Sequence, residues 1–389
     1  MTNNKLNIAL VARKLDMTGG GSDQSLKLLY NTLSKKGHNV DIITVNSDKN
    51  NCDSVEPIEY QVPRNRIKEI KRTKNILQKH ESYDLYHIFN PGLLVGAGLY
   101  KSIGDNPVVG RLNTYNLFCT NISKMDDSCH RDCKTIDKIS HDDVKDIKKF
   151  VKFPEYLSRT HIIPHIVNNV DLLFAQSPSV KKIYKANGYS NIITIPNFCD
   201  PNFPPNRKSS DVRNTNNQPT KFLYVGRLEK QKGIDTLLSA FEQAGTKSKL
   251  TIVGDGRMKA KVKSYADSRS NVSYHGWIDH ADLFSYYNQS DVFVHPGEWP
   301  DPCPRTILES LQCQTPCLVS NVGAPPWMAG DAGTTYRPGD PVDLAETITA
   351  LSKNDYRLNQ LESNTEARVD FFSKDNILPQ VIENYNRCV

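Results

Sequence analysis

The chain has 389 residues, of which 38% are hydrophobic and 24% are charged, and its formal net charge is +6. This composition indicates a globular chain long enough for two domains and excludes a disordered protein. The modest positive charge permits anionic partners but does not indicate a nucleic-acid partner, and no nucleic-acid-binding motif is present.

No apolar run approaches the roughly 20 residues that a membrane-spanning helix needs. The N-terminal residues lack the layout of a signal peptide, so we expect a cytoplasmic protein. The nine cysteines are scattered and odd in number, which favours reduced thiols over a disulfide framework.

The first 45 residues predict a strand, a helix and a second strand. Residues 6–12 are an apolar run of strand length, and the glycine cluster Gly19-Gly20-Gly21 follows them. Apolar residues then recur at helical spacing until Gly37 ends the helix: Leu26, Leu29, Tyr30 and Leu33. Residues 39–45 are the next strand, so this βαβ unit predicts a parallel sheet.

A basic amphipathic segment spans residues 64–80. Its seven lysines and arginines surround an apolar stripe made of Ile67, Ile70, Ile76 and Leu77. We interpret it mainly as a surface helix packed on the N-terminal sheet. The alternative is peripheral contact with an anionic membrane surface.

A cysteine-rich segment holds Cys119, Cys129, His130 and Cys133. The C-x3-C spacing is looser than that of a zinc knuckle. We therefore interpret the segment mainly as a loop with buried thiols, and a metal site is the alternative.

The second half of the chain repeats the strand–helix–strand scheme. Residues 220–228 and 248–256 are strands that run into glycines, Gly226 and Gly254, with a helix between them. We predict two Rossmann-like domains, residues 1–200 and 220–370, joined by a linker at 201–219 that is rich in Pro, Asn and Ser. A closing helix at 371–389, interrupted early by Pro379, is expected to pack back towards the N-terminal domain.

Two such α/β domains are expected to enclose a deep interdomain cleft, with ligands outside the carboxyl ends of the strands. Arg227 and Lys232 follow a strand on a glycine-bounded loop, where a planar fork and a point charge suit a diphosphate. A solvated basic loop is the alternative. The triple glycine lets backbone amides approach a phosphate at a helix N-terminus, although it is neither a Walker loop nor a dinucleotide fingerprint. A tight turn with no ligand is the alternative there.

The segment 295–316 follows a short buried strand and contains two carboxylates eight positions apart, Asp301 and Glu309. Pro304 fixes φ and suits the entry to a helix that we place at 305–314. Asp301 would precede the helix and Glu309 would lie inside it, where two acceptors could hold sugar hydroxyls. The amides of Arg305 and Thr306 would be available for a phosphate. A charged loop before an N-capped surface helix is the alternative.

Together these blocks resemble the retaining glycosyltransferases of family four, which have the GT-B fold. The resemblance covers nearly the whole chain through blocks in a specific order: "GGGSDQSLKLLYNTLSKKGHNVDIIT", "VDLLFAQSPSVKKIYKANGYSNIITIPNFCD", "VGRLEKQKGIDTLLSAF", "LTIVGDG", "VSYHGWI", "SDVFVHPGEWPDPCPRTILESLQCQTPCLVSNVGAPP" and "YRPGD". Asp301 and Glu309 fall at the two positions of the family's E-x7-E pair.

The resemblance implies a role for each matching residue. Arg227 and Lys232 would bind the donor diphosphate and stabilise the departing nucleoside diphosphate. Glu309 would hold the ribose hydroxyls and Asp301 would contact the transferred sugar. The glycine loop would approach the donor phosphate and the acceptor, and "HGWI" would pack near the base. Neither a cofactor nor a divalent metal is expected, since the cationic side chains take the place of the metal.

Two departures from the family stand out. The first carboxylate is Asp301 rather than Glu, which bears on the identity of the sugar. Asn113 stands where many members carry a His, and an amide cannot act as a base. The family's retention is usually explained by the leaving phosphate taking the acceptor's proton, so that His is not required. His87 is a further candidate, although a structural histidine is the main interpretation.

The predicted site therefore has two groups of residues. The catalytic candidates are Arg227, Lys232, Asp301, Glu309 and Asn113, and the substrate-binding candidates are Gly19, Gly20, Gly21, His87, Gly226, Gly254, Arg305 and Thr306.

The predicted reaction moves a hexosyl-type unit from a UDP- or GDP-linked sugar to a glycan or lipid-linked acceptor, in cell-surface polysaccharide or glycoconjugate biosynthesis. It would take place in the cytoplasm, and the alternative is peripheral attachment of the enzyme to the inner face of the membrane through residues 64–80. Two alternatives are a catalytically weak sugar-nucleotide-binding protein and a GT-B sugar-nucleotide epimerase.

Overall fold

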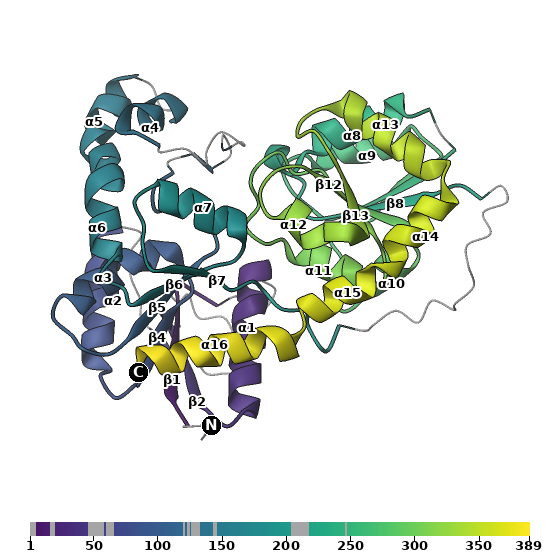
Figure 1. Cartoon of the computed structure of the whole chain (residues 1–389). Helices are drawn as coiled ribbons and strands as arrows, with labels where there is room; N and C mark the ends of the chain where they lie inside the picture. The colour runs from purple at the N-terminus through teal and green to yellow at the C-terminus, as the bar shows by residue number, and fades with distance from the viewer. Residues whose placement is uncertain are drawn as a thin grey trace. The chain divides into compact units, whose positions relative to one another are not determined.

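The computed structural model describes residues 5–15, 20–45, 58–59, 66–119, 121–122, 125, 133–142, 146–203, 218–245 and 247–389. The chain forms two compact units (Figure 1). The first comprises Met1–Ile122, Ser128–Pro196 and Leu378–Val389, and the second comprises Ser123–Asp127 and Asn197–Ile377.

The first unit contains a parallel sheet in the order β3-β2-β1-β4-β5-β6-β7. Its strands are β1 (Asn7–Ala12), β2 (Asn39–Thr44), β3 (Ile58–Glu59), β4 (Leu85–Ile88), β5 (Val108–Leu112), β6 (Leu172–Ala175) and β7 (Ile192–Thr194). Its helical segments are α1 (Gly21–Lys35), α2 (Arg66–Lys79), η1 (Pro91–Leu93), α3 (Leu94–Lys101), α4 (Thr135–His141), α5 (Asp146–Leu157), the π-helical turn η4 (Ser158–Ile162), α6 (Ile163–Val167) and α7 (Pro178–Ala186).

The second unit contains a parallel sheet in the order β10-β9-β8-β11-β12-β13. Its strands are β8 (Lys221–Val225), β9 (Lys249–Val253), β10 (Val272–Tyr274), β11 (Val292–His295), β12 (Cys317–Ser320) and β13 (Gly333–Tyr336). Its helical segments are η5 (Lys230–Lys232), α8 (Ile234–Gln243), α9 (Lys259–Asp267), α10 (Leu283–Asn288), α11 (Arg305–Gln312), α12 (Pro325–Ala329), η6 (Gly330–Ala332), α13 (Pro341–Ser352), α14 (Asp355–Ser363) and α15 (Thr365–Phe371).

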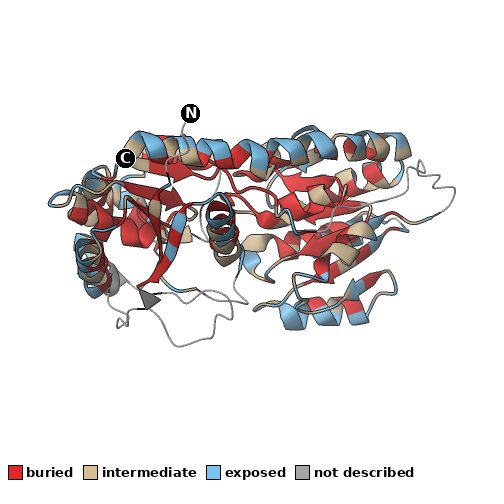
Figure 2. Cartoon of the chain, turned by 90° about the horizontal axis from the view of Figure 1, so that it is seen from below, coloured by how far each residue is buried: buried red, intermediate tan, exposed pale blue. Residues whose placement is uncertain are grey.

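The sheet of the second unit is covered on both faces, because successive side chains of a strand point to opposite faces. Phe222 and Tyr224 of β8 pack with apolar residues of α8, α9 and α13, whereas Leu223 and Val225 pack with those of α10, α11 and α12. Figure 2 shows the buried residues concentrated on the strands and on the inner sides of the helices. Both units therefore have the doubly wound α/β architecture, which confirms the two predicted Rossmann-like domains.

The strand order reverses at one point in each sheet. In the first unit this switch point lies between β1 and β4, and in the second it lies between β8 and β11. In open α/β sheets, ligands bind outside the carboxyl ends of the strands at such a point.

The basic helix α2 packs on α3. A Cβ at Gly96 of α3 would lie 2.6 Å from the carbonyl oxygen of Ile70, so glycine permits this close approach. Ile76 and Leu77 are buried, and Ile67 at the start of α2 remains 64% exposed. Most of the apolar stripe is therefore covered by the protein, as the surface-helix interpretation expects.

The closing helix α16 (Lys374–Cys388) runs through Pro379 rather than being interrupted by it. The missing N–H of Pro379 leaves one carbonyl near the helix start, that of Asp375, without its intrahelical partner. One lost hydrogen bond so close to the end of a helix does not stop the helix. Within the described residues, no helix is both long and apolar enough to cross a membrane.

Candidate active site

A glycine follows the carboxyl end of each of the strands β8, β9 and β10, namely Gly226, Gly254 and Gly276. Gly254 has φ +139°, and a Cβ there would lie 1.8 Å from the carbonyl oxygen of Gly226, so only glycine fits. The Gly254 amide donates to the carbonyl of Gly276 at 2.6 Å. The two glycines that the sequence placed at strand ends therefore lie in contact at the same edge of the sheet.

Arg227 directly follows Gly226 and is exposed. Its carbonyl accepts a hydrogen bond from the Tyr224 hydroxyl at 2.8 Å, and the Leu228 N–H joins its loop to the next one by donating to the backbone carbonyl of Asp255 at 2.9 Å. Its guanidinium makes no hydrogen bond or ion pair with any described part of the chain. A planar fork on an anchored backbone is thus available to an anion.

Lys232 forms an ion pair with Asp301, with 2.5 Å between Lys232 Nζ and Asp301 Oδ2. The side chains are 17% and 9% exposed. Gly233 has φ +71°, and a Cβ there would lie 1.8 Å from the Pro296 carbonyl oxygen, so glycine lets the Lys232 loop approach the segment that precedes Asp301. The Lys232 ammonium also lies 5.2 Å from the centre of the Trp299 ring. The predicted phosphate-binding lysine and the first carboxylate of the pair are therefore direct partners.

His295 ends β11 on the other side of Asp301. Its Nε2 lies 3.8 Å from Asp301 Oδ2, and its Nδ1 is buried with no hydrogen-bond partner among the described residues. Burial raises the pKa of Asp301, but the Lys232 ammonium and the His295 imidazole outweigh it and hold that pKa well below its usual range. Asp301 is therefore ionised at neutral pH.

Glu309 lies on α11 and is only 2% exposed. Its Oε1 is 3.1 Å from His280 Nε2, and its Oε2 accepts a hydrogen bond from the Tyr287 hydroxyl at 3.0 Å. Arg305 and Thr306 open α11 after Pro304, which has φ −66° and precedes the helix as predicted. The availability of their amides for a phosphate stays a prediction.

Arg227 and Asp301 flank the switch point of the second sheet. Arg227 follows β8 and Asp301 follows β11, the strands between which the order reverses. The charges of Arg227 and Asp301 both act on the pKa of Tyr224. Burial raises this pKa, the Arg227 charge lowers it and the Asp301 charge raises it further. The second unit thus brings Arg227, Lys232 and Asp301 to one edge, while Glu309 is held by a separate set of partners.

The candidates of the first unit lie at the ends of its own strands. Asn113 follows β5, and its side-chain amide donates to Ser22 Oγ and to the Phe89 carbonyl, each at 3.0 Å. Ser22 comes directly after Gly20 and Gly21, which open α1, so Asn113 lies beside the predicted glycine loop. Gly19 lies outside the described residues.

His87 is fully buried in β4. Its Nδ1 lies 2.5 Å from the hydroxyl of Tyr385 on α16, and its ring packs edge-on against Phe174. Burial, with a smaller contribution from the Arg111 charge, holds the pKa of His87 well below its usual value. The imidazole is neutral and covered by protein.

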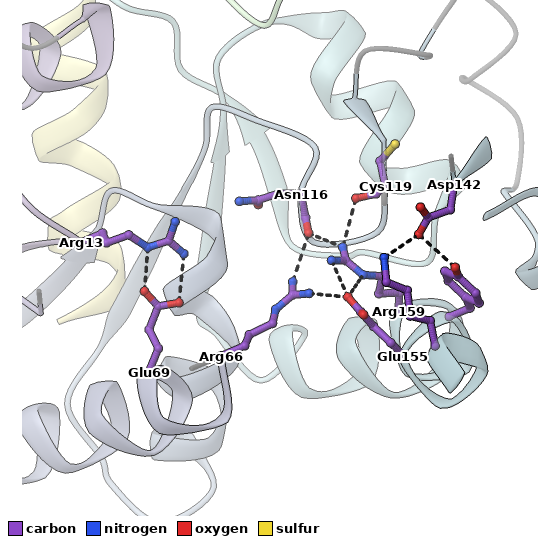
Figure 3. A network of polar contacts seen from close by, with 10 residues as sticks. Arg13, Arg66, Glu69, Asn116, Cys119, Asp142, Glu155 and Arg159 are labelled. Atoms are coloured by element: carbon purple, nitrogen blue, oxygen red, sulfur yellow. Dashed lines mark hydrogen bonds and ion pairs between the residues drawn. The ribbon is translucent and has the colours of Figure 1, made fainter. Parts of the chain in front are cut away.

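A polar network that the sequence did not predict holds the loops at the carboxyl end of the first sheet (Figure 3). Arg13 binds both oxygens of Glu69 at 2.6 and 2.9 Å. Arg66 and Arg159 share one oxygen of Glu155, each at 2.9 Å. Arg159 and Arg66 also donate to carbonyls of the loop that follows β5, namely Asn116 and, for Arg159 alone, Cys119. Arg159 lies in the π-helical turn η4, a kind of irregularity that frequently accompanies functional sites.

The cysteine-rich segment is only partly described. Cys119 is buried and Cys133 is partly exposed, while Cys129 and His130 lie outside the described residues. In the part of the chain that is described, no three metal-ligating side chains gather. The metal alternative there stays a prediction.

Sequence reasoning missed His280, Tyr287 and His295. The two histidines could have been found from their positions near strand ends: His295 is the last residue of β11, and His280 lies in the loop that follows β10. Their contacts with the two carboxylates depend on packing between segments 6 to 29 residues apart, which no local pattern shows.

Two family models match consecutive parts of the chain. The model described as Glycosyltransferase Family 4 matches residues 19–203, and the model described as Glycosyl transferases group 1 matches residues 206–368. A sucrose-phosphate synthase structure from Thermosynechococcus elongatus superposes with a TM-score of 0.73 at 21% identity, over 98% of this chain and 99% of that one.

The chain is a glycosyltransferase family 4-like protein of the GT-B fold.

A second solved structure agrees with this fold, and a curated relative matches part of the chain. Anabaena Alr3699/HepE in complex with UDP-glucose superposes with a TM-score of 0.70 at 17% identity, over 98% of this chain and 100% of that one. A GDP-mannose-dependent alpha-(1-6)-phosphatidylinositol dimannoside mannosyltransferase from Mycobacterium tuberculosis is 29% identical over 163 residues, which are 40% of this chain and 42% of the relative. The matched part spans less than half the length of such curated relatives.

Proposed function

We propose that this GT-B protein is a retaining glycosyltransferase that moves a hexosyl-type unit from a nucleotide-diphospho-sugar to a glycan or lipid-linked acceptor without a divalent metal. The observation that carries the proposal is the guanidinium of Arg227, which has no hydrogen-bond or ion-pair partner among the described residues and lies at the same edge of the second sheet as the Lys232–Asp301 pair. An unpaired fork and a lysine beside a buried carboxylate suit a diphosphate that is joined to a sugar.

Each group has a part in the proposed reaction. The acceptor hydroxyl attacks C1 of the sugar, the bond from C1 to the phosphate oxygen breaks, and the leaving phosphate takes the proton of the hydroxyl. The products are a glycoside and a nucleoside diphosphate. Arg227 and Lys232 stabilise the negative charge that grows on the leaving group. Asp301, which Lys232 and His295 keep ionised, accepts a hydrogen bond from the transferred sugar.

The names of relatives support the donor class. One similar structure holds UDP-glucose, and one curated relative is GDP-mannose-dependent. A nucleotide-diphospho-sugar is common to both, so UDP- and GDP-linked donors are the first to test.

Contact with the inner face of the membrane, where a lipid-linked acceptor would lie, belongs to this proposal. Because Ile76 and Leu77 are buried, such contact through α2 would depend on its exposed lysines, such as Lys68 and Lys71. We expect flotation with anionic vesicles at low salt and its loss at high salt. No binding at low salt would reject the membrane contact and leave a cytoplasmic enzyme.

The transfer proposal is tested by incubating the protein with UDP-, GDP- and ADP-sugars and measuring nucleoside diphosphate release with varied acceptors. We expect release from one donor class, unchanged by EDTA and lowered about 100-fold or more by Arg227→Ala. Nuclear magnetic resonance of the glycoside should show the anomeric configuration of the donor. Binding without release would favour a sugar-nucleotide-binding protein, and conversion of the nucleotide-linked sugar without release would favour an epimerase.

A further inference from the structure

The described residues fill half of the hydrogen-bond acceptor positions of the Glu309 carboxylate. A carboxylate has about four acceptor positions. His280 takes one at 3.1 Å and Tyr287 takes another at 3.0 Å, one on each oxygen. Within the described part of the chain, two acceptor positions therefore remain on a group that is almost completely buried. Buried carboxylates are stable when such positions are filled, so the remaining pair points to a ligand with two neighbouring hydroxyls.

The two partners of Glu309 differ in exposure. Tyr287 is fully buried and packs edge-on against Phe293, with 5.6 Å between ring centres. Burial and the neighbouring Glu309 charge raise the pKa of Tyr287 well above its usual value, so its hydroxyl always carries a proton to donate. His280 is 31% exposed, and its ring lies 5.2 Å from that of Phe203. Tyr287 thus anchors the carboxylate from inside, and His280 meets it from the solvent side.

The family resemblance already assigns the ribose hydroxyls to Glu309, and we propose that His280 and Tyr287 are the positioning residues that orient its carboxylate towards the vicinal 2′- and 3′-hydroxyls of the donor's ribose. This inference depends on the proposed function, which supplies a nucleoside diphosphate as ligand. It adds the two side chains that orient the carboxylate, and it explains why a histidine stands in the loop between β10 and α10.

The arrangement makes the site selective for ribose over 2′-deoxyribose. A deoxynucleotide leaves one acceptor position of a buried carboxylate unfilled, which lowers its affinity about tenfold or more. Without the His280 bond, the carboxylate can rotate or meet water, and the missing hydroxyl then matters less. His280→Ala should therefore weaken the ribonucleotide more than the deoxyribonucleotide.

Isothermal titration of the full chain with UDP, GDP and ADP and with their 2′-deoxy counterparts tests the inference. For the ribonucleotide that binds, we expect the wild type to prefer ribose about tenfold or more and His280→Ala to lower that ratio to about threefold or less. His280→Gln offers an amide N–H near the place of Nε2 and should restore part of the ratio. Tyr287→Phe removes the other donor, keeps the ring and should also lower the ratio. His165→Ala, at an exposed position of α6 in the first unit, is the matched control.

The outcomes separate the two proposals. If a ribonucleotide binds and the ratio stays the same in His280→Ala and Tyr287→Phe, the positioning role is rejected and the donor site stands. An equal loss of affinity for both nucleotides would likewise reject it, since that is the effect of a merely structural histidine. If none of the six nucleotides binds the wild type, the proposed function itself fails.

Discussion

An arginine follows the first strand of each sheet at its switch point: Arg13 follows β1 and Arg227 follows β8. Both lie where an α/β sheet binds ligands. Glu69 binds Arg13 through both of its carboxylate oxygens, whereas the Arg227 guanidinium makes no such contact with the described residues. Two cations at equivalent places in the sequence pattern therefore have different uses: one holds a helix to a loop and the other is available to a ligand.

The same contrast extends to the neighbouring charges. In the first unit, Arg66 and Arg159 are bonded to Glu155 and to loop carbonyls (Figure 3). In the second unit, Lys232 is paired with Asp301, a residue that itself matches a ligand-binding motif. A basic residue after a strand is thus insufficient evidence for an anion site, because a carboxylate elsewhere in the chain can take it.

The largest expected effect comes from breaking the pair in the second unit. Asp301→Asn leaves the mostly buried Lys232 ammonium without its counter-charge, so we expect a loss of about 3 kcal/mol in the free energy of unfolding. Urea denaturation followed by circular dichroism measures it. The double variant Lys232→Met with Asp301→Asn should recover much of this loss, since no charge is then left unpaired. Asp255→Asn, which breaks an exposed ion pair with Lys259, is the control and should leave the denaturation curve almost unchanged. An equal loss in the single and double variants would show that the ion pair is not the cause.

Much of the fold could be predicted because its signals are local. Apolar runs that end in Gly226 and Gly254 marked strands, and Pro304 marked the start of α11. The ion pair of Lys232 with Asp301 could not be predicted, because it joins residues 69 positions apart through the close approach of Gly233 to Pro296. Arg13 and Glu69 are 56 positions apart, and nothing in the local sequence of either residue marks the other as its partner.

The second test replaces each of the two arginines, Arg13 and Arg227, with alanine in a separate variant. Arg13→Ala leaves the mostly buried Glu69 without its bidentate partner, and we expect a loss of about 2 kcal/mol in the free energy of unfolding. Arg227→Ala removes an exposed side chain, so stability should change by less than about 0.5 kcal/mol while nucleoside diphosphate affinity falls. Denaturation curves and titrations of both variants measure the two quantities. Loss of stability in Arg227→Ala with none in Arg13→Ala would reverse the assignment of the two arginines.

The smallest effect concerns His87, a further buried polar group of the first unit. Burial and the Arg111 charge keep its pKa well below the usual value of about 6.5, so the folded state does not take up the proton that the unfolded state binds. The stabilising contribution is complete above about pH 6.5 and is lost as the pH falls, by about 1 kcal/mol between pH 6.5 and 5.5. Burial also lowers the pKa values of His38 and His80, so these two histidines contribute to the same loss of stability at acidic pH, called the acid limb below.

Denaturation curves between pH 7.5 and pH 5.5 isolate the part that belongs to His87. His87→Gln keeps a polar group opposite Tyr385 but cannot be protonated, so the variant should be less stable at pH 7.5 and should lose less stability on acidification. His165→Gln, at an exposed position of α6, should keep the slope of the wild type. A wild-type slope in His87→Gln would mean that His38, His80 or the carboxylates carry the acid limb. Tyr385 would then hold His87 for packing alone, and the polar groups of this sheet would contribute to stability without any part in its pH dependence.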